Sequence, residues 1–202
     1  IKIFKTHNAF WKAGNYAFTN QKNTKGVIHI VRDPRNVITS VKNHFSMETY
    51  SEAFSFMNNI KQSIGSRLNN EDTDLPTVLS SWSNHYNSWK KFNKNYLLIK
   101  YENLLNDTHK EFNKIVMYLN KNLELNFNKE QIDKAIKNCD FEKLKEQENN
   151  EGFKESAKDK SGNIKKFFYL GPRNDWFKIL DQKTRENIEN EFSKELIELG
   201  YL

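Results

Sequence analysis

Three short apolar segments, separated by stretches with helical patterns, constrain the fold of this chain more than any other feature. They lie at residues 1–5, 27–32 and 96–101. Each is mostly apolar along its length instead of alternating with polar residues, as is typical of strands covered on both faces. Strands of this kind that alternate with helices form a parallel sheet. The sequence therefore predicts an α/β fold of three layers, with helices flanking a parallel sheet.

The helical segments carry recognisable start signals. Asp33 followed by Pro34 predicts an N-cap and a proline in the first turn of a helix that runs to residue 44. Further helices are expected after Pro76 with Trp82, Tyr86 and Trp89 at helical spacing, at 108–120 after Asp107, after Asn128 with Gln131 in a capping box, and from Asp181 to Gly200. The charged segment 143–160 is expected to be a solvated loop.

Length and composition indicate one domain over residues 1–202. Hydrophobic residues make up 37% of the chain and charged residues 29%, and no apolar run is long enough to cross a bilayer. The single cysteine, Cys139, excludes an internal disulfide and a cysteine-based zinc cluster, and we expect a cytoplasmic location. The chain opens on a strand pattern and not on a methionine or a signal peptide, so we expect an N-terminally truncated domain.

The net charge of +6 allows two interpretations. It can reflect a solvated surface with a small excess of lysine, or it can serve a site for an anionic ligand. Lysine and arginine are spread along the chain without a recognisable nucleic-acid-binding module, so we expect no nucleic-acid partner. No spacing of His, Asp and Glu suggests a metal site.

Ligands of open α/β sheets bind beyond the carboxyl ends of the strands, which directs attention to the residues there. Arg32 ends the second strand, where a guanidinium can make paired hydrogen bonds to a phosphate. Ser40 follows eight residues later, about two turns into the predicted helix, and can donate to the same anion. The alternative is that Arg32 pairs with Asp33 or Glu102 in a structural role.

Lys5 and His7 follow the first strand. A histidine at a strand end can act as a general base near neutral pH. The lysine two residues earlier points the same way along a strand and can hold a developing negative charge. A surface histidine without a catalytic role is the competing interpretation of this pattern.

Six segments resemble, in order, those of the PAPS-dependent sulfotransferases, where PAPS is 3'-phosphoadenylyl sulfate. They are 5–7 (Lys-Thr-His), 27–40 (strand, Arg-Asp-Pro-Arg turn and helix), 81–85 (Ser-Trp-Ser-Asn-His), 98–104 (a strand leading into Tyr-Glu-Asn-Leu), 139–144 (Cys-Asp-Phe-Glu-Lys-Leu) and 171–176 (Gly-Pro-Arg-Asn-Asp-Trp). Together they span nearly the whole chain. The resemblance implies a P-loop NTPase-like sulfotransferase fold without its first strand and phosphosulfate loop.

The resemblance also implies residue roles. His7 corresponds to the catalytic base of the family, with Lys5 beside it. Arg32 and Ser40 correspond to the contacts of the cofactor's 3'-phosphate, Tyr101 and Phe141 to those of the adenine, and Gly171 and Arg173 fall in the C-terminal cofactor loop.

Three departures from the family pattern stand out. The loop that cradles the 5'-phosphosulfate is missing, because only four residues precede Lys5. Tyr169 and Leu170 stand where the family has Arg-Lys, leaving Arg173, Lys165 or Lys166 to supply the charge. Cys139 and Asp140 replace a Thr-Ser pair, and a carboxylate near a phosphate is unfavourable unless it faces away.

The expected function is transfer of a sulfuryl group from PAPS to the hydroxyl or amine of a small-molecule or glycan acceptor, without a metal. Two alternatives stay open. One is a degenerate sulfotransferase-like module that binds the nucleotide without catalysis, and the other is a P-loop phosphotransferase that shares the fold.

Overall fold

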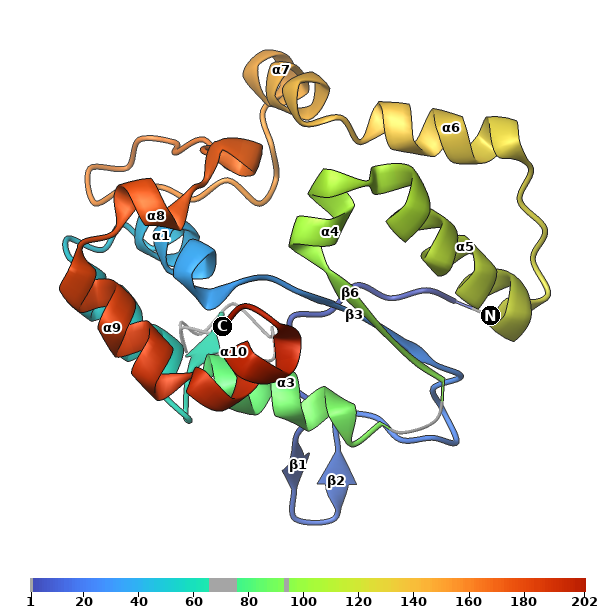
Figure 1. Ribbon diagram of the computed structural model, residues 1–202, viewed down its shortest axis with the longest axis horizontal. Coiled ribbons are helices and arrows are strands. Elements are labelled where there is room, and N and C mark those ends of the chain that lie inside the picture. The colour runs from blue at the N-terminus through green and yellow to red at the C-terminus, as the bar shows by residue number, and fades with distance from the viewer. Residues whose placement is uncertain (1, 66–75, 93–94) are drawn as a thin grey trace.

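The computed structural model describes residues 2–65, 76–92 and 95–202, and its centre is a parallel pair of strands (Figure 1). Strand β3 (Val27–Val31) runs beside β6 (Tyr96–Lys100), with Val27 opposite Tyr96 and Val31 opposite Lys100. Both strands were predicted, each one residue too long. The predicted α/β class with a parallel sheet is thus confirmed.

The predicted first strand is wrong. Residues 2–9 form no strand, and Ile3 and Phe4 are 73% and 80% exposed. An apolar pattern becomes a strand only where a neighbouring strand offers a hydrogen-bond ladder. Here β3 and β6 pair with each other, and nothing in the described chain pairs with residues 2–9 in a ladder.

Two further pairs of short antiparallel strands lie in the part of the chain that the structure describes. β1 (Lys12–Ala13) pairs with β2 (Tyr16–Ala17), and β4 (Ser63–Ile64) pairs with β5 (Thr77–Val78). Pro76 therefore precedes a strand and not the predicted helix. Helix α3 (Trp82–Lys90) begins later, because the Ser81 side chain caps it by accepting from the Asn84 N–H.

Local capping explains where most helices begin. Asp33 caps α1 (Pro34–His44), Asp107 caps α5 (Thr108–Leu123), and Asn128 and Gln131 form a complete capping box on α6 (Lys129–Asn138), all as predicted. The remaining helices are α2 (Tyr50–Asn58), α4 (Tyr101–Asn106), α7 (Phe141–Glu151), the 3-10 turn η1 (Gly171–Arg173), α8 (Trp176–Ile179), α9 (Gln182–Glu191) and α10 (Ser193–Leu199).

Three of these helices correct two of the predictions. The expected loop at 143–160 begins as helix α7, because Asp140 caps it by accepting from the backbone N–H groups of Glu142 and Lys143. The Asp140 carboxylate is thus used at a helix N-terminus, where negative charge is favourable. The single last helix divides into α9 and α10 at Phe192, which is fully buried between them.

The core lies on one side of the strand pair. Its largest cluster joins α1, α2, α9 and α10, and a smaller one of Val31, Tyr86 and Leu199 fixes α3 and α10 against β3. Helices α4 and α5 contact β6 and lie on the other side of the strands (Figure 1). The larger cluster comprises Ile38, Ala53, Met57, Leu180, Ile188, Phe192 and Leu196.

Arg35 holds the start of α1 to the C-terminal part of the chain. Its guanidinium is 2.8 Å from an Asp33 carboxylate oxygen and 2.6 Å from one of Glu189, and it also donates to the Tyr201 backbone oxygen. The Arg35 and Asp33 side chains are each 5% exposed.

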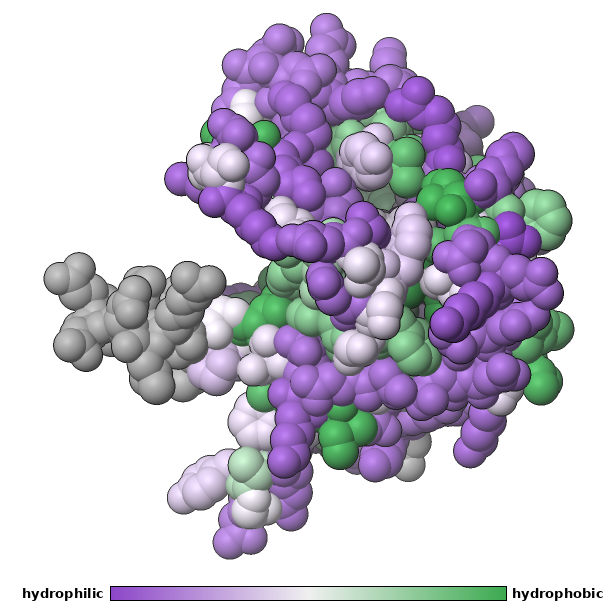
Figure 2. Space-filling model, turned by 90° about the vertical axis from the view of Figure 1, so that its left-hand side faces the viewer, coloured by the Kyte–Doolittle hydropathy of each residue, from purple (hydrophilic) through white to green (hydrophobic). Residues whose placement is uncertain are grey.

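The surface facing the viewer in Figure 2 is mostly hydrophilic with apolar patches toward its middle. No described helix combines the length and apolar content that crossing a bilayer requires.

Candidate functional site

The parallel pairing of β3 and β6 brings together the residues that follow each strand. Arg32 comes directly after β3, and Tyr101 is the first residue of α4, directly after β6. The Arg32 guanidinium lies over the Tyr101 ring, 4.3 Å from its centroid. A cation on the face of an aromatic ring is held in a defined orientation, so Tyr101 fixes the direction in which Arg32 presents its donors.

Asp33 and Glu102 are the carboxylates with which Arg32 would pair if its role were structural. Both are bound to other groups. Asp33 pairs with Arg35. Glu102 accepts from the Asp33 backbone N–H at 2.9 Å through one oxygen and from the Tyr201 hydroxyl at 2.5 Å through the other. Over the described residues, no carboxylate lies within ion-pair distance of Arg32.

The guanidinium of Arg32 therefore keeps donors that the chain itself does not use. Its Nε is buried and has no hydrogen-bond partner among the described residues, and its Nη2 makes only a long contact of 3.5 Å with the Gly171 oxygen. Buried polar groups are nearly always hydrogen-bonded, so an unpaired donor of this kind suits an anionic ligand.

Gly171 and Phe141 lie together at the same place. Gly171 has a φ of +53°, and a Cβ built on it would come within 2.1 Å of the Phe141 ring. Only glycine fits here, both because of the left-handed backbone and because of this close approach. Phe141, the first residue of α7, also packs edge-on against Phe168 at 6.0 Å. Through Gly171, the aromatic ring of α7 is brought to the end of the sheet where Arg32 lies.

The segment after Gly171 lies along α1. The Asn174 amide donates to the Asn36 backbone oxygen at 2.9 Å and to Thr39 Oγ1 at 2.7 Å. Ser40 follows Thr39 on this helix and is exposed. Asn174 itself is buried, and its Oδ1 has no hydrogen-bond partner in the part of the chain described. Arg173 points outward and is 3.9 Å from Glu142, with both side chains largely exposed.

Lys5 and His7 lie in a second group with residues from two other parts of the chain. Lys5 Nζ is 2.6 Å from Glu155 Oε1. This hydrogen bond lowers the pKa of the Glu155 carboxyl, and the nearby charges of Lys5, His7 and His44 lower it further. Burial lowers the pKa of His44, at the end of α1. The structure thus places Lys5 beside the segment after α7, with His7 and the end of α1 within electrostatic range of Glu155.

Two residues of these groups had not been singled out from the sequence. Asn174 lies within the 171–176 segment, where the resemblance gave it no role of its own. Glu155 offered no signal, because its contact with Lys5 joins residues that are 150 positions apart. The candidate charges at Lys165 and Lys166 differ in use, since Lys165 donates to the Asn43 backbone oxygen at the end of α1.

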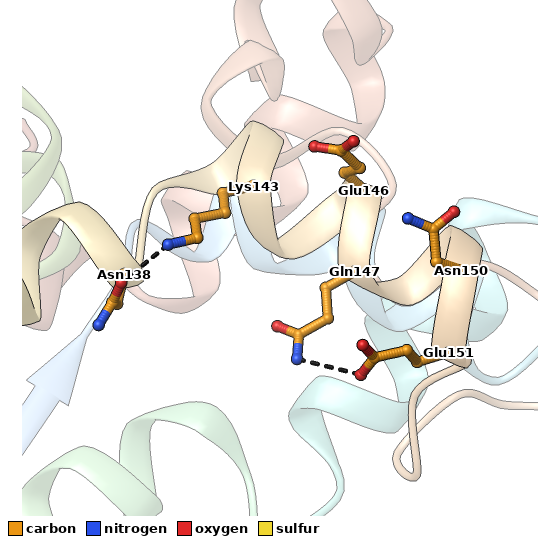
Figure 3. Close-up of a pocket in the computed structure, with 6 residues that line it drawn as sticks. All are labelled: Asn138, Lys143, Glu146, Gln147, Asn150 and Glu151. Carbon is orange, nitrogen blue, oxygen red and sulfur yellow. Dashed lines mark hydrogen bonds between the residues drawn. The ribbon is translucent and has the colours of Figure 1, made fainter.

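A separate pocket on the surface of the molecule lies along helix α7. It is lined by α7 and the end of α6, and its side chains are polar, with one lysine and two glutamates (Figure 3). Lys143 donates to Asn138 across it, and Gln147 donates to Glu151. None of the predicted site residues lines it.

The described residues hold no group of three or more His, Cys, Asp or Glu side chains placed to bind a metal ion.

Comparison with known proteins agrees with this arrangement, in which Arg32 lies at the carboxyl edge of a parallel sheet without a carboxylate partner among the described residues. A sequence model of the family described as "Sulfotransferase domain" matches residues 1–200. The chain belongs to the sulfotransferase domain family. It is 31% identical over 133 residues to "Sulfotransferase 2A1" of Homo sapiens and 30% identical over 132 residues to that of Macaca fascicularis. Each match takes in 59% of this chain and 39% of the relative's length.

Solved structures share the fold. The chain superposes on mouse sulfotransferase SULT7A1 complexed with PAP with a TM-score of 0.58 and 21% identity, over 85% of this chain and 58% of that one. It superposes on retinol dehydratase in a complex with retinol and PAP with a TM-score of 0.58 and 19% identity, over 85% of this chain and 47% of that one.

Proposed function

We propose that the protein transfers a sulfuryl group from PAPS to an acceptor hydroxyl or amine. The observation that carries this proposal is the Arg32 guanidinium, which is oriented by Tyr101, buried at Nε and free of carboxylate partners among the described residues. Membership of the sulfotransferase domain family supports it, as do two solved neighbours whose names include PAP, the 3',5'-bisphosphate left after transfer.

The nucleotide is assigned to the group around Arg32. Arg32 and Ser40 bind the 3'-phosphate, and Gly171 and Arg173 belong to the loop that closes over it. Tyr101 and Phe141 hold the adenine. The glycine requirement at residue 171 supports this arrangement, because that glycine lets Phe141 approach the loop. The exposure of Arg173 and Ser40 leaves both side chains accessible to a ligand.

The transfer step is assigned to His7 and Lys5. His7 accepts the proton of the acceptor group as that oxygen or nitrogen bonds to sulfur. The bond between sulfur and the 5'-phosphate oxygen breaks, and PAP leaves with that electron pair. Lys5 stabilises the charge that develops on this oxygen, so the step depends on positioning and charge neutralisation. The Lys5–Glu155 pair is half-exposed, and such pairs are worth at most about 1 kcal/mol, so the donor's oxyanions can displace Glu155.

An apolar small molecule is a better acceptor for this chain than a glycan. Aromatic rings continue from His44 through Phe45 and Phe56 and through Phe167 and Phe153, with neighbouring centroids between 4.6 and 6.4 Å apart. Since His44 and His7 both act electrostatically on Glu155, the partner of Lys5, these rings begin near the proposed transfer group. One solved neighbour, retinol dehydratase, was crystallised with retinol in one structure and with androsterone in another, and both ligands are apolar alcohols. A cytoplasmic location is part of this proposal and rests on the absence of cysteine pairs.

A second candidate function is nucleotide binding without transfer. It is favoured by the ion pair that occupies Lys5 and by Tyr169 and Leu170, which replace two basic residues of the family pattern. Phosphoryl transfer is the third candidate and rests on fold similarity alone.

Calorimetry with PAP and an assay of sulfuryl transfer separate these functions. We expect PAP to bind the unaltered protein and the Lys121→Ala control, whose exposed lysine lies on α5, and to bind Arg32→Ala at least tenfold more weakly. Equal affinity of all three proteins would remove Arg32 from the site. Binding of PAP without transfer from PAPS to any of a panel of apolar alcohols and phenols would favour the second candidate.

A further inference from the structure

The segment that carries His7 is fixed by the side chains of α3. The His85 ring Nε2 lies 3.3 Å from the His7 backbone oxygen, and the Trp89 indole N–H donates to the Asn8 backbone oxygen at 2.9 Å. The Ser88 hydroxyl accepts from the Phe10 backbone N–H at 2.9 Å. Positions 85, 88 and 89 share one face of a helix, so three successive contacts come from a single rigid surface.

The same segment is held from its other side by β5. The Val78 backbone N–H donates to the Asn8 side-chain oxygen at 2.8 Å, and the Ala9 N–H donates to the Val78 oxygen at 2.7 Å. Ala9 is buried, whereas His7 is exposed two residues earlier. The chain therefore leaves the protein interior at Asn8, and His85 is the α3 side chain that holds residue 7 itself.

The contact between His85 and His7 defines the state of the His85 ring. A carbonyl oxygen only accepts, so Nε2 of His85 must carry the hydrogen. Burial lowers the pKa of His85, which keeps its ring neutral at neutral pH. Behind it lies the His29 ring, with centroids 5.7 Å apart, and His29 Nδ1 is 2.8 Å from the Tyr96 hydroxyl. His85 is thus backed by His29 of β3, which Tyr96 of β6 holds in turn.

We propose that His85 is a positioning residue for His7, with Ser88 and Trp89 as its supports. The proposal rests on the proposed function, in which His7 is the base. A catalytic residue on a strand is placed by the ladder of the sheet, but residues 2–9 form no strand. The hydrogen bond at the His7 carbonyl takes over that task, because it fixes the peptide next to the carbon that bears the imidazole. Loss of this bond misplaces the base without touching the nucleotide site.

Sulfuryl transfer by the intact protein tests this role through a matched pair of variants. His85→Leu removes the donor, and His85→Gln keeps an N–H at nearly the same reach. We expect His85→Leu to lower kcat about 10- to 100-fold with the affinity for PAP unchanged, and His85→Gln to recover most of the loss. His109→Ala, an exposed histidine on α5, serves as the control and should match the unaltered protein. An unchanged kcat in His85→Leu would overturn the proposal, as would an equal loss in His85→Gln.

A readout that needs no activity keeps this proposal separate from the proposed function. In NMR spectra we expect His85→Leu to shift the backbone amide signal of Asn8 and the ring signals of His7, while Trp89→Phe shifts the amide of Ala9. Both changes should appear even if PAP does not bind, in which case the proposed function fails and the positioning contact stands. Unshifted His7 ring signals in a folded His85→Leu protein would refute the positioning role.

Discussion

Arg32 lies over the ring of Tyr101 at the point where two parallel strands end, with 4.3 Å between the guanidinium carbon and the ring centroid. The register of β3 and β6 produces this contact, since Val31 is opposite Lys100 and each residue of the pair comes next in its chain. Arg32 makes this contact without a carboxylate partner among the described residues, so its positive charge stays available. A ring thus orients this cation while leaving its hydrogen-bond donors free.

Replacing Tyr101 tests whether the ring or its hydroxyl matters. We expect Tyr101→Leu to weaken PAP binding several-fold, because Arg32 loses its orienting surface, whereas Tyr101→Phe should bind within about twofold of the unaltered protein. Isothermal calorimetry measures both. If Tyr101→Phe and Tyr101→Leu lose affinity to the same extent, the hydroxyl and not the ring carries the effect.

Gly171→Ala should be more damaging than alanine at a comparable glycine. Gly14 has a φ of +57° with open space around its Cβ position, whereas Gly171 has a φ of +53° and faces the Phe141 ring. Both substitutions carry the backbone cost of about 1 kcal/mol, and only Gly171→Ala adds a steric cost of about 1–3 kcal/mol. Urea unfolding gives both values. The double variant Gly171→Ala, Phe141→Ala should recover the steric part, and failure to recover it would contradict the contact.

Arg35→Met should destabilise the fold by about 3–5 kcal/mol. The substitution leaves the Asp33 carboxylate buried without its partner, and the penalty for such a charge is large. Arg173→Ala is the matched control, because its ion pair with Glu142 is exposed and long, and we expect it to change stability by less than about 0.5 kcal/mol. Comparable losses in the two variants would show that the network around Arg35 contributes little.

Acid should weaken the fold through His29. Burial, with a smaller effect of the His85 charge, lowers the pKa of His29 from 6.5 to about 4. The unfolded chain binds this proton at higher pH than the folded one, so the stabilising effect is fully present above pH 6.5 and is lost as pH falls toward 4. The loss amounts to about 3 kcal/mol. His29→Gln, which can still bond to Tyr96, should flatten the pH dependence of the urea midpoint between pH 4 and 6.5, and an unchanged slope would contradict the shift.

His7→Ala should lower turnover at least about 100-fold in the intact protein, because the general base is lost. Binding of PAP should be unaffected, since His7 lies with Lys5 and not with Arg32 and the other residues assigned to the nucleotide. A steady-state assay with calorimetry on the same sample measures both. Turnover equal to that of the unaltered protein would remove His7 from the mechanism.

The sequence predicted those parts of the fold that depend on local signals. Asp33 and Pro34 define the start of α1 within a few residues, and the apolar patterns of β3 and β6 indicate burial directly. Residues 1–5 have the same pattern, but a strand also needs a partner, which no local pattern reveals. Helix α7 was missed because its surface is polar and charged, so its main signal was the Asp140 cap.

The same contrast between local signals and long-range packing applies to the site residues. Arg32 was predicted from its place at the carboxyl end of a parallel strand, and Tyr101 from the family resemblance; that the two residues touch agrees with the rule that such strand ends meet. The roles of all the predicted site residues stay predictions, namely those of Lys5, His7, Arg32, Ser40, Tyr101, Phe141, Gly171 and Arg173. The pairing of Lys5 with Glu155 and the bonds from α3 to residues 7–10 depend on how distant segments pack, which spacing along the chain does not encode.

The Tyr201 hydroxyl keeps Glu102 engaged, and this gives a residue just after α10 an influence on the carboxyl end of the sheet, where Arg32 lies. Deleting the residues after Gly200 would release one carboxylate oxygen of Glu102 close to Arg32, and it would also take one acceptor from Arg35. An internal acid would then compete with any phosphate for the same guanidinium. A variant that lacks Tyr201 would consequently bind anions more weakly, although every residue assigned to the nucleotide is still present.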